Sequence, residues 1–265
     1  MKIDDWFKSA TLGAERPRLP ALKVHIKMIK DIVRRVVGEG NRGRLDIFLH
    51  PDMKDSWGGP FNGQKFRQRV FFDLLYYFPI KAIVETGTYY GTTTALFGAT
   101  CLPVYTAEIH PRYFSYAKMR FLFNRNIHLY KGDTRSFLRY LSENSSVAKE
   151  DVFFYLDAHW EEDLPLCDEL EIIFSKWRGP IVMIDDFHVP NSDYKFDDYG
   201  PGKVINLSYI GSVVSAHKLS VFFPAVNSSE ETGERRGSVI LCQEMSGLEV
   251  DKKIKTLTRE ISYTA

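Results

Sequence analysis

The sequence has no run of about 18 consecutive apolar residues, so we expect no membrane-spanning helix. Its 265 residues carry a formal net charge of only +1, whereas nucleic-acid-binding domains usually have a marked basic excess. The first residues, 1–6, also lack the apolar core of a secretory signal. We therefore expect neither a membrane nor a nucleic acid as a partner.

Cysteine is scarce as well: the three cysteines are Cys101, Cys167 and Cys242. Their odd number and wide spacing fit neither a disulfide framework nor a zinc site, and they are typical of a reducing compartment. We expect a cytoplasmic protein. The length is sufficient for one large α/β domain with its own core.

Short apolar runs alternate with helical patterns from residue 65 onward. After a helix over about 65–78, we expect five strands, at 82–86, 104–108, 127–130, 152–157 and 181–185. Strands that recur at roughly 25-residue intervals, with helices between them, predict a parallel sheet with right-handed crossovers.

The two ends of the chain follow other patterns. The segments 219–223 and 238–243 are apolar and are joined by a polar loop, which predicts a closing antiparallel hairpin. Residues 20–37 have apolar positions at helical spacing, and this helix either packs on the core, contacts another copy of the chain or forms a lid. We expect 1–64 to be an N-terminal helical extension and loop, offering a surface for a homo-oligomer, and 65–265 to be one cofactor-binding domain.

The most informative stretch runs from Ile83 to Thr93. A β-branched run leads to Glu85, two glycines follow at Gly87 and Gly91, and threonines then open an expected helix. Glycines let the backbone approach a ligand closely, and the unpaired N–H groups at a helix start face that ligand. The pattern is typical of a nucleotide-binding strand, turn and helix.

The acids near this turn indicate which cofactor it binds. Dinucleotide sites have a glycine where this chain has Glu85, and a carboxylate there would repel a diphosphate. Glu108 ends the second expected strand, about 20 residues after Gly87, where an acid can accept both hydroxyls of a ribose. S-adenosylmethionine has a ribose and a cationic sulfonium and no phosphate, so it fits these acids. Asp133 is expected to accept from the adenine amino group, and a domain for another nucleotide is the alternative.

With these residues the sequence resembles the class I S-adenosylmethionine-dependent methyltransferases, and most of all the metal-dependent catechol-type and macrocin-type O-methyltransferases. The first catechol-type motif, Glu-x-Gly-x-Tyr-x-Gly-x-Ser/Thr, is matched by Glu85, Gly87, Tyr89, Gly91 and Thr93. The resemblance covers about residues 65–245. It implies a Rossmann-like, doubly wound, mostly parallel seven-stranded sheet with a C-terminal antiparallel hairpin. The residues expected to bind the cofactor are Glu85, Gly87, Thr88, Tyr89, Gly91, Thr92, Thr93, Glu108, Asp133 and Asp157.

Acidic residues also follow the fourth and fifth expected strands, as Asp157 and as the pair Asp185 and Asp186. Carboxylates that meet at such strand ends form a hard oxygen site suited to Mg²⁺ or another hard divalent cation. The resembled family places its metal on an Asp after strand four and on an Asp followed by Asn or Asp after strand five. The resemblance therefore implies Asp157, Asp185 and Asp186 as metal ligands, and surface acids or helix N-caps are the alternative interpretation.

The catalytic base does not follow from the resemblance. The catechol enzymes have a lysine just after the tryptophan of an Asp-His-Trp motif, whereas this chain has Glu161 after Trp160 and an inserted Ala158. Because imidazole titrates near working pH, His159 is the first expected base and His188 the second. A packed or solvent-facing histidine is the alternative.

The residues and the resemblance together predict an enzyme, a Mg²⁺-dependent O-methyltransferase. It would move a methyl group from S-adenosylmethionine to a hydroxyl of a small molecule, such as a sugar or a natural-product scaffold. Loops at 57–64, 189–202 and 231–233 are expected to line or close over the acceptor pocket. Two alternatives stay open: the same fold with non-methylating or hydroxylase-associated chemistry, and a cofactor-binding subunit of a biosynthetic complex.

Overall fold

The computed structural model describes residues 38–159, 163–243, 249–250 and 252–260. The predicted 20–37 helix, and any association through it, lies outside the described residues. No helix within the described ranges is both long and apolar enough to cross a membrane. The described chain begins with helical residues 38–49 and continues through three elements, η1 (Pro51–Gly58), η2 (Pro60–Gly63) and α3 (Lys65–Tyr77).

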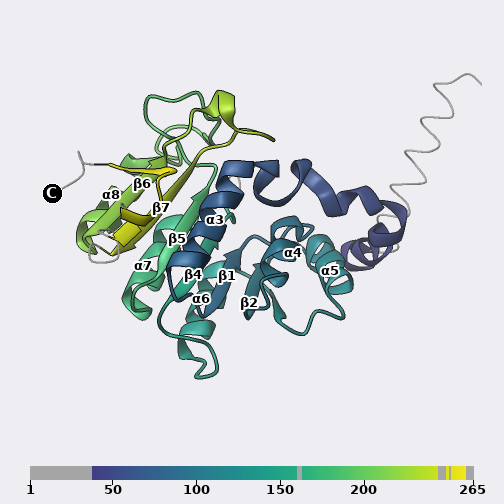
Figure 1. The fold of residues 1–265 in the computed structure, drawn as a ribbon. Helices are drawn as coiled ribbons and strands as arrows, with labels where there is room; N and C mark the ends of the chain where they lie inside the picture. The colour runs from purple at the N-terminus through teal and green to yellow at the C-terminus, as the bar shows by residue number, and fades with distance from the viewer. Residues whose placement is uncertain (1–37, 160–162, 244–248, 251, 261–265) are drawn as a thin grey trace, which may run out of the picture.

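The described residues form one eight-stranded sheet, in the order β3-β2-β1-β4-β5-β7-β6-β8. Its parallel strands are β1 (Ala82–Thr86), β2 (Val104–Glu108), β3 (Ile127–Lys131), β4 (Val152–Leu156) and β5 (Ile181–Asp185). The antiparallel strands are β6 (Leu219–Pro224), β7 (Ser238–Gln243) and β8 (Leu257–Arg259). The doubly wound, mostly parallel sheet and its closing hairpin are therefore confirmed (Figure 1), and the predicted strand number of seven is corrected to eight.

Helices cover both faces of this sheet and bury two separate cores. One face packs against α6 (Thr134–Glu143), α7 (Leu166–Lys176) and α8 (Leu207–Ala216). The other packs against α3, α4 (Thr92–Gly98) and α5 (Pro111–Arg120). The adjacent residues Ile83 and Val84 belong to different cores, because successive strand side chains point to opposite faces. Covering both faces explains why every residue of β1, β4 and β5 is buried.

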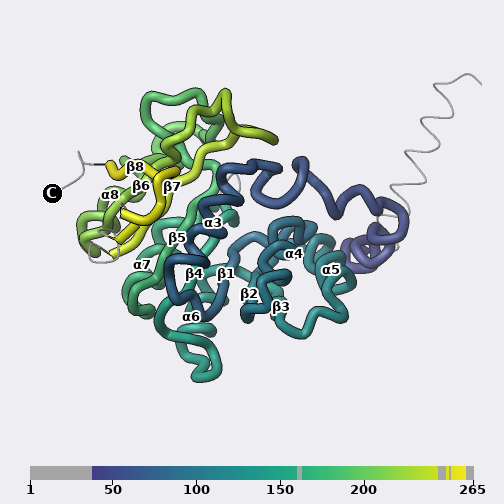
Figure 2. The backbone as a smooth tube through the Cα atoms, viewed as in Figure 1, coloured from purple at the N-terminus to yellow at the C-terminus, as the bar shows by residue number. Residues whose placement is uncertain are grey.

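The segment before α3 and the loop before β7, far apart in the sequence, pack against each other (Figure 2). The hydroxyl of Thr232 donates to the carbonyl oxygen of Gly63 at 2.7 Å, and Glu234 N–H donates to Asn62 O at 3.0 Å. A Cβ on Gly233 would be 2.0 Å from the same Asn62 oxygen, so only glycine fits there. Two loops that we expected to border the acceptor pocket are thus joined to each other.

Candidate cofactor and metal site

The turn after β1 brings the chain into backbone contact with the end of β4. Gly87 has φ +88°, and a Cβ on it would be 2.3 Å from the carbonyl oxygen of Asp157. The N–H of Asp157 donates to Thr86 O at 2.9 Å. Gly91 is the N-cap of α4 with φ +75°, and a Cβ there would be 2.5 Å from the ring of Phe121. Both glycines of the motif are therefore required by positive φ and by close packing.

Glu85 is buried in β1 and is held by hydroxyl groups. One of its carboxylate oxygens accepts from Thr94 at 2.5 Å and from Thr106 at 2.6 Å. The Thr106 hydroxyl also lies 2.6 Å from that of Thr88, a predicted cofactor residue. Burial raises the pKa of Glu85 to about 7, the two hydrogen bonds oppose this rise, and Glu108 adds to it. A cation nearby would favour the ionised carboxylate.

Glu108, at the end of β2, orders the glycine turn. Its two oxygens accept from the backbone N–H groups of Tyr89 at 2.8 Å and of His110 at 2.7 Å. Burial raises its pKa and these hydrogen bonds oppose the rise. Tyr89 has φ +51°, and its ring lies 4.4 Å from that of Tyr90 and 4.5 Å from that of Tyr113, centroid to centroid. A carboxylate has about four acceptor positions, and the two N–H groups occupy two of them. The predicted contact with the ribose would use the remaining positions.

The threonines at the start of α4 hold the preceding segment in place. The Thr92 hydroxyl donates to Lys54 O at 3.2 Å and lies 3.0 Å from Ser56 Oγ. The Thr93 hydroxyl accepts from the N–H of Phe61 at 3.1 Å. These contacts fasten η1 and η2 to α4, and cofactor contacts from the two threonines stay predictions.

Asp133 follows β3 and is the N-cap of α6. It accepts from the N–H groups of Arg135 at 3.0 Å and Ser136 at 3.2 Å, and the Arg135 guanidinium pairs with it at 2.6 Å. The hydrogen bond from the Arg135 side chain is the main cause that lowers the pKa of Asp133. The structure thus shows a capping role for Asp133, and its contact with adenine stays a prediction.

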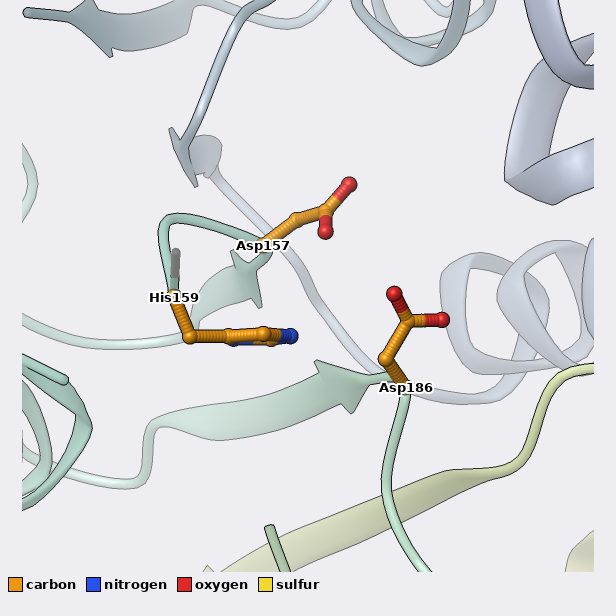
Figure 3. A group of neighbouring side chains, drawn as sticks. All are labelled: Asp157, His159 and Asp186. Carbon is orange, nitrogen blue, oxygen red and sulfur yellow. The ribbon is translucent and has the colours of Figure 1, made fainter. Parts of the chain in front are cut away.

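Three side chains converge where β4 and β5 end. Ligand atoms of Asp157, His159 and Asp186 all lie within 4.8 Å of one another, and Figure 3 shows the three side chains turned toward a common space. Burial, and then the nearby Asp185, raise the pKa values of both Asp157 and Asp186 well above the usual range. Carboxylates crowded in this way are stabilised as ions when they share a cation.

His159 gives a second, independent sign of a ligand. It is 5% exposed, and its Nε2 has no hydrogen-bond partner within the part of the chain that the structure describes. Burial is the main cause that lowers its pKa, against the opposing charges of Asp197 and Asp185, and this favours the neutral ring. With the proton on Nδ1, the Nε2 atom offers a lone pair. An unpaired buried polar atom costs about 1–3 kcal/mol. A divalent cation bound to Nε2 and both carboxylates would remove that cost, so the donor set fits a metal ion.

Asp185, also predicted as a metal ligand, is not one of the three residues of this cluster but lies next to it. Its oxygens accept from the Arg67 guanidinium, the Tyr155 hydroxyl, the Asn62 amide at 3.1 Å and the Asp186 N–H at 2.7 Å. Burial alone would raise its pKa, but Arg67 and the donated hydrogen bonds lower it. Asp185 therefore lies close enough to Asp157 and Asp186 to raise their pKa values, but its oxygens are engaged by these donors, and its role as a metal ligand stays a prediction.

Sequence reasoning missed the two arginines that pair with these acids. Arg67 lies in α3, 118 residues before its partner Asp185, and is 4% exposed. Arg236, just before β7, pairs with Asp186 and with Asp197. The sequence indicates only that buried carboxylates need cations or hydrogen-bond donors as partners. It does not indicate which of the many basic residues supplies them.

His188, the second predicted base, also lies outside the cluster. Its ring stands edge-on to the ring of Phe196, with the centroids 4.5 Å apart. The backbone N–H of His188 donates to the carbonyl oxygen of Ile205 at 2.8 Å. A catalytic role for His188 stays a prediction.

No protein-family model matches the chain, and no curated protein matches it. It is similar to the solved structure of an O-methyltransferase from Bacillus cereus in complex with S-adenosylhomocysteine, with 16% identity over 67% of this chain and 81% of that chain and a TM-score of 0.48. It is also similar to a structure on the conversion of a disulfide bond into a thioacetal group during echinomycin biosynthesis (12% identity, 74% and 88% covered, TM-score 0.49). A third is an rRNA methylase from Streptococcus thermophilus (13% identity, 66% and 94% covered, TM-score 0.44). At such identities the function of the site has to follow from its own residues.

Proposed function

We propose that this chain is an S-adenosylmethionine-dependent O-methyltransferase of the class I type. In this proposal a divalent cation assists it, and the acceptor is a hydroxyl of a small molecule such as a sugar or a natural-product scaffold. The contact between Gly87 and the Asp157 carbonyl, where a Cβ would come within 2.3 Å, carries the proposal. This contact brings together two parts of the proposed site. One is the glycine turn, which suits the methyl donor, and the other is the cluster of Asp157, His159 and Asp186, which suits an acceptor and its cation.

The acids at the glycine turn support a cationic cofactor. Glu85 is buried with a pKa of about 7, so a positive charge nearby stabilises its ionised form and a diphosphate would not. Glu108 lies at the end of the next strand with both oxygens fixed by the backbone. A fixed carboxylate at that strand end is placed to receive ribose hydroxyls.

The residues of the cluster support acceptor binding. Asp157, His159 and Asp186 would hold the cation, which would supply positive charge to acidify an acceptor hydroxyl and to position its oxygen. S-adenosylmethionine supplies the methyl group: the acceptor oxygen bonds to the methyl carbon as the carbon–sulfur bond breaks, which leaves S-adenosylhomocysteine. The joined loops near Gly63 and Thr232 would limit the entry of water. The contribution of the protein is then mainly positioning and electrostatic stabilisation.

His159 is the proposed proton acceptor if its Nε2 does not bind the cation, and His188 is the proposed acceptor if it does. The lone pair on Nε2 of His159 can take a proton or a cation but not both, so these two roles of His159 exclude each other.

A methyl-transfer assay tests the proposal. The protein would be incubated with S-adenosylmethionine labelled in its methyl group and with a panel of catechols and vicinal diols, with and without a divalent cation. We expect labelled methyl ether and S-adenosylhomocysteine in equal amounts, and loss of both with Asp157→Asn. The exposed Glu143→Gln, in α6, is the control. Cofactor binding without transfer to any acceptor would favour the binding-subunit alternative, and a protein that does not bind the cofactor would contradict the proposal.

A further inference from the structure

We propose that His159 is a metal ligand and that the site formed by Asp157, His159 and Asp186 selects a first-row transition ion, such as Mn²⁺, over Mg²⁺. The inference rests on the proposed metal site and names the class of ion that it takes. It also assigns the lone pair of His159 to the cation instead of to a substrate proton.

The position of the imidazole is the first argument. Nε2 of His159 is buried and, among the described residues, unpaired, and a ring nitrogen of His159 lies within 4.8 Å of carboxylate oxygens of Asp157 and Asp186. Figure 3 shows the ring edge turned toward the two carboxylates. A ring nitrogen that offers a lone pair gains nothing from a carboxylate oxygen, whereas one cation between them would stabilise all three groups.

The second argument is that, among the residues that the structure describes, the cluster contains two carboxylates and no third. Mg²⁺ prefers oxygen ligands in an octahedral arrangement. A free carboxylate of Asp185 would have given three carboxylate ligands, together with those of Asp157 and Asp186. Four donors already occupy the oxygens of Asp185, among them Arg67 and Tyr155. The remaining set has two oxygens and one nitrogen, and imidazole suits transition ions, whose affinities for such sites rise along the first row above that of Mn²⁺.

The backbone that carries His159 is held from outside the cluster. The Tyr199 hydroxyl lies 3.2 Å from the carbonyl oxygen of His159 and 2.5 Å from a carboxylate oxygen of Asp197. Asp197 is in turn paired with Arg236. Groups behind a ligand that fix its orientation are typical of built metal sites.

The test is direct metal binding to the metal-free protein. Calorimetric titrations with Mn²⁺ and with Mg²⁺ would be run on the wild type, His159→Asn and the control His128→Asn, whose exposed ring stacks on Tyr105 instead. We expect the wild type to bind Mn²⁺ at least about 10-fold more tightly than Mg²⁺, and His159→Asn to weaken Mn²⁺ binding about 10- to 100-fold. Pulsed electron paramagnetic resonance of bound Mn²⁺ should show coupling to an imidazole nitrogen in the wild type and in His128→Asn, and none in His159→Asn.

Other outcomes distinguish a failure of this inference from a failure of the proposed metal site or of the proposed cofactor site. Tight Mn²⁺ binding without nitrogen coupling, or unchanged binding in His159→Asn, would overturn the role of His159 and leave a metal site in place. Failure of the folded wild type to bind either ion would overturn the metal site as well. Titration of the same metal-free protein with S-adenosylhomocysteine reports on the cofactor separately. If His159→Asn does not fold, His159→Asp serves instead, because its all-oxygen set should narrow the preference for Mn²⁺ over Mg²⁺.

Discussion

The carbonyl oxygen of Asp157 occupies the space that a side chain on Gly87 would need, since a Cβ there would come within 2.3 Å of it. The turn that follows β1 and the end of β4 are therefore in backbone contact. This contact places the predicted cofactor turn beside the cluster of Asp157, His159 and Asp186.

We expect Gly87→Ala to destabilise the protein by roughly 1–3 kcal/mol, because alanine is strained at positive φ and would also meet the Asp157 backbone. The same change should weaken S-adenosylhomocysteine binding at least about 10-fold, since the turn must shift. Urea unfolding and calorimetric titration measure the two effects. Gly202→Ala is the control: Gly202 has φ +74° but no atom within 4 Å of an added Cβ, so it should lose some stability and keep the affinity. Gly87→Ala with wild-type affinity would contradict the placement of the cofactor.

Binding of S-adenosylmethionine should release protons through Glu85. The pKa of Glu85 is about 7 in the free protein, so this carboxyl is about half protonated at pH 7. A cation nearby lowers that pKa, so binding at pH 7 should release up to about half a proton per cofactor. Calorimetry in buffers of different ionisation enthalpy measures this release, and Glu85→Gln should abolish it. Proton uptake, or release that persists in Glu85→Gln, would count against the role of Glu85.

Arg67 and Asp185 should be strongly coupled in stability. Arg67→Met leaves a buried carboxylate without its cation, and such a loss typically costs about 3–5 kcal/mol. The double variant Arg67→Met/Asp185→Leu removes both charges, so it should be less destabilised than the sum of the single variants. Chemical denaturation of the four proteins of this cycle gives the coupling energy. Additive effects would show that the ion pair does not anchor this edge of the sheet.

Glu169 should make stability fall as pH rises. It is buried in α7, and burial raises its pKa from the ordinary value of 4.5 to about 7, although the nearby hydroxyl groups of Thr134 and Thr86 oppose the rise. Between these two pH values the folded protein binds more protons than the unfolded chain, so the free energy of unfolding decreases as pH increases.

Glu169→Gln should remove that part of the pH dependence and stabilise the protein at pH 8, by at most on the order of 3 kcal/mol. Urea unfolding at several pH values between 4.5 and 8 measures it, with the exposed Glu143→Gln as control. The same slope in Glu169→Gln and wild type would refute the assignment.

Most of the sheet could be predicted because its strands are buried on both faces. Every residue of β4 and β5 is buried, which requires apolar runs that stand out in the sequence. The missed strand β8 has only three residues, none of them buried, and lies at the edge of the sheet. A short edge strand needs no apolar run, so its sequence has no comparable signal.

Asp185 and Asp186 show why the site was predicted less completely. Their position after an apolar run places both at the edge of the sheet, but Asp185 is the last residue of β5 and Asp186 follows the strand in a left-handed conformation, which changes the direction of its side chain. Asp185 points to Arg67 of α3, whereas Asp186 has φ +54° and joins the cluster with Asp157. Which acid meets the arginine depends on how α3 packs, and nothing local to the two aspartates encodes that.

The central claim, a cationic methyl donor at the glycine turn, is tested most directly by competitive calorimetric titration with S-adenosylmethionine, S-adenosylhomocysteine and NAD⁺. We predict saturable one-to-one binding of the first two ligands, weaker binding of both by Glu108→Ala, and no competition from NAD⁺. Binding of NAD⁺ in preference to both, or no binding of either sulfur ligand to the folded protein, would contradict the account.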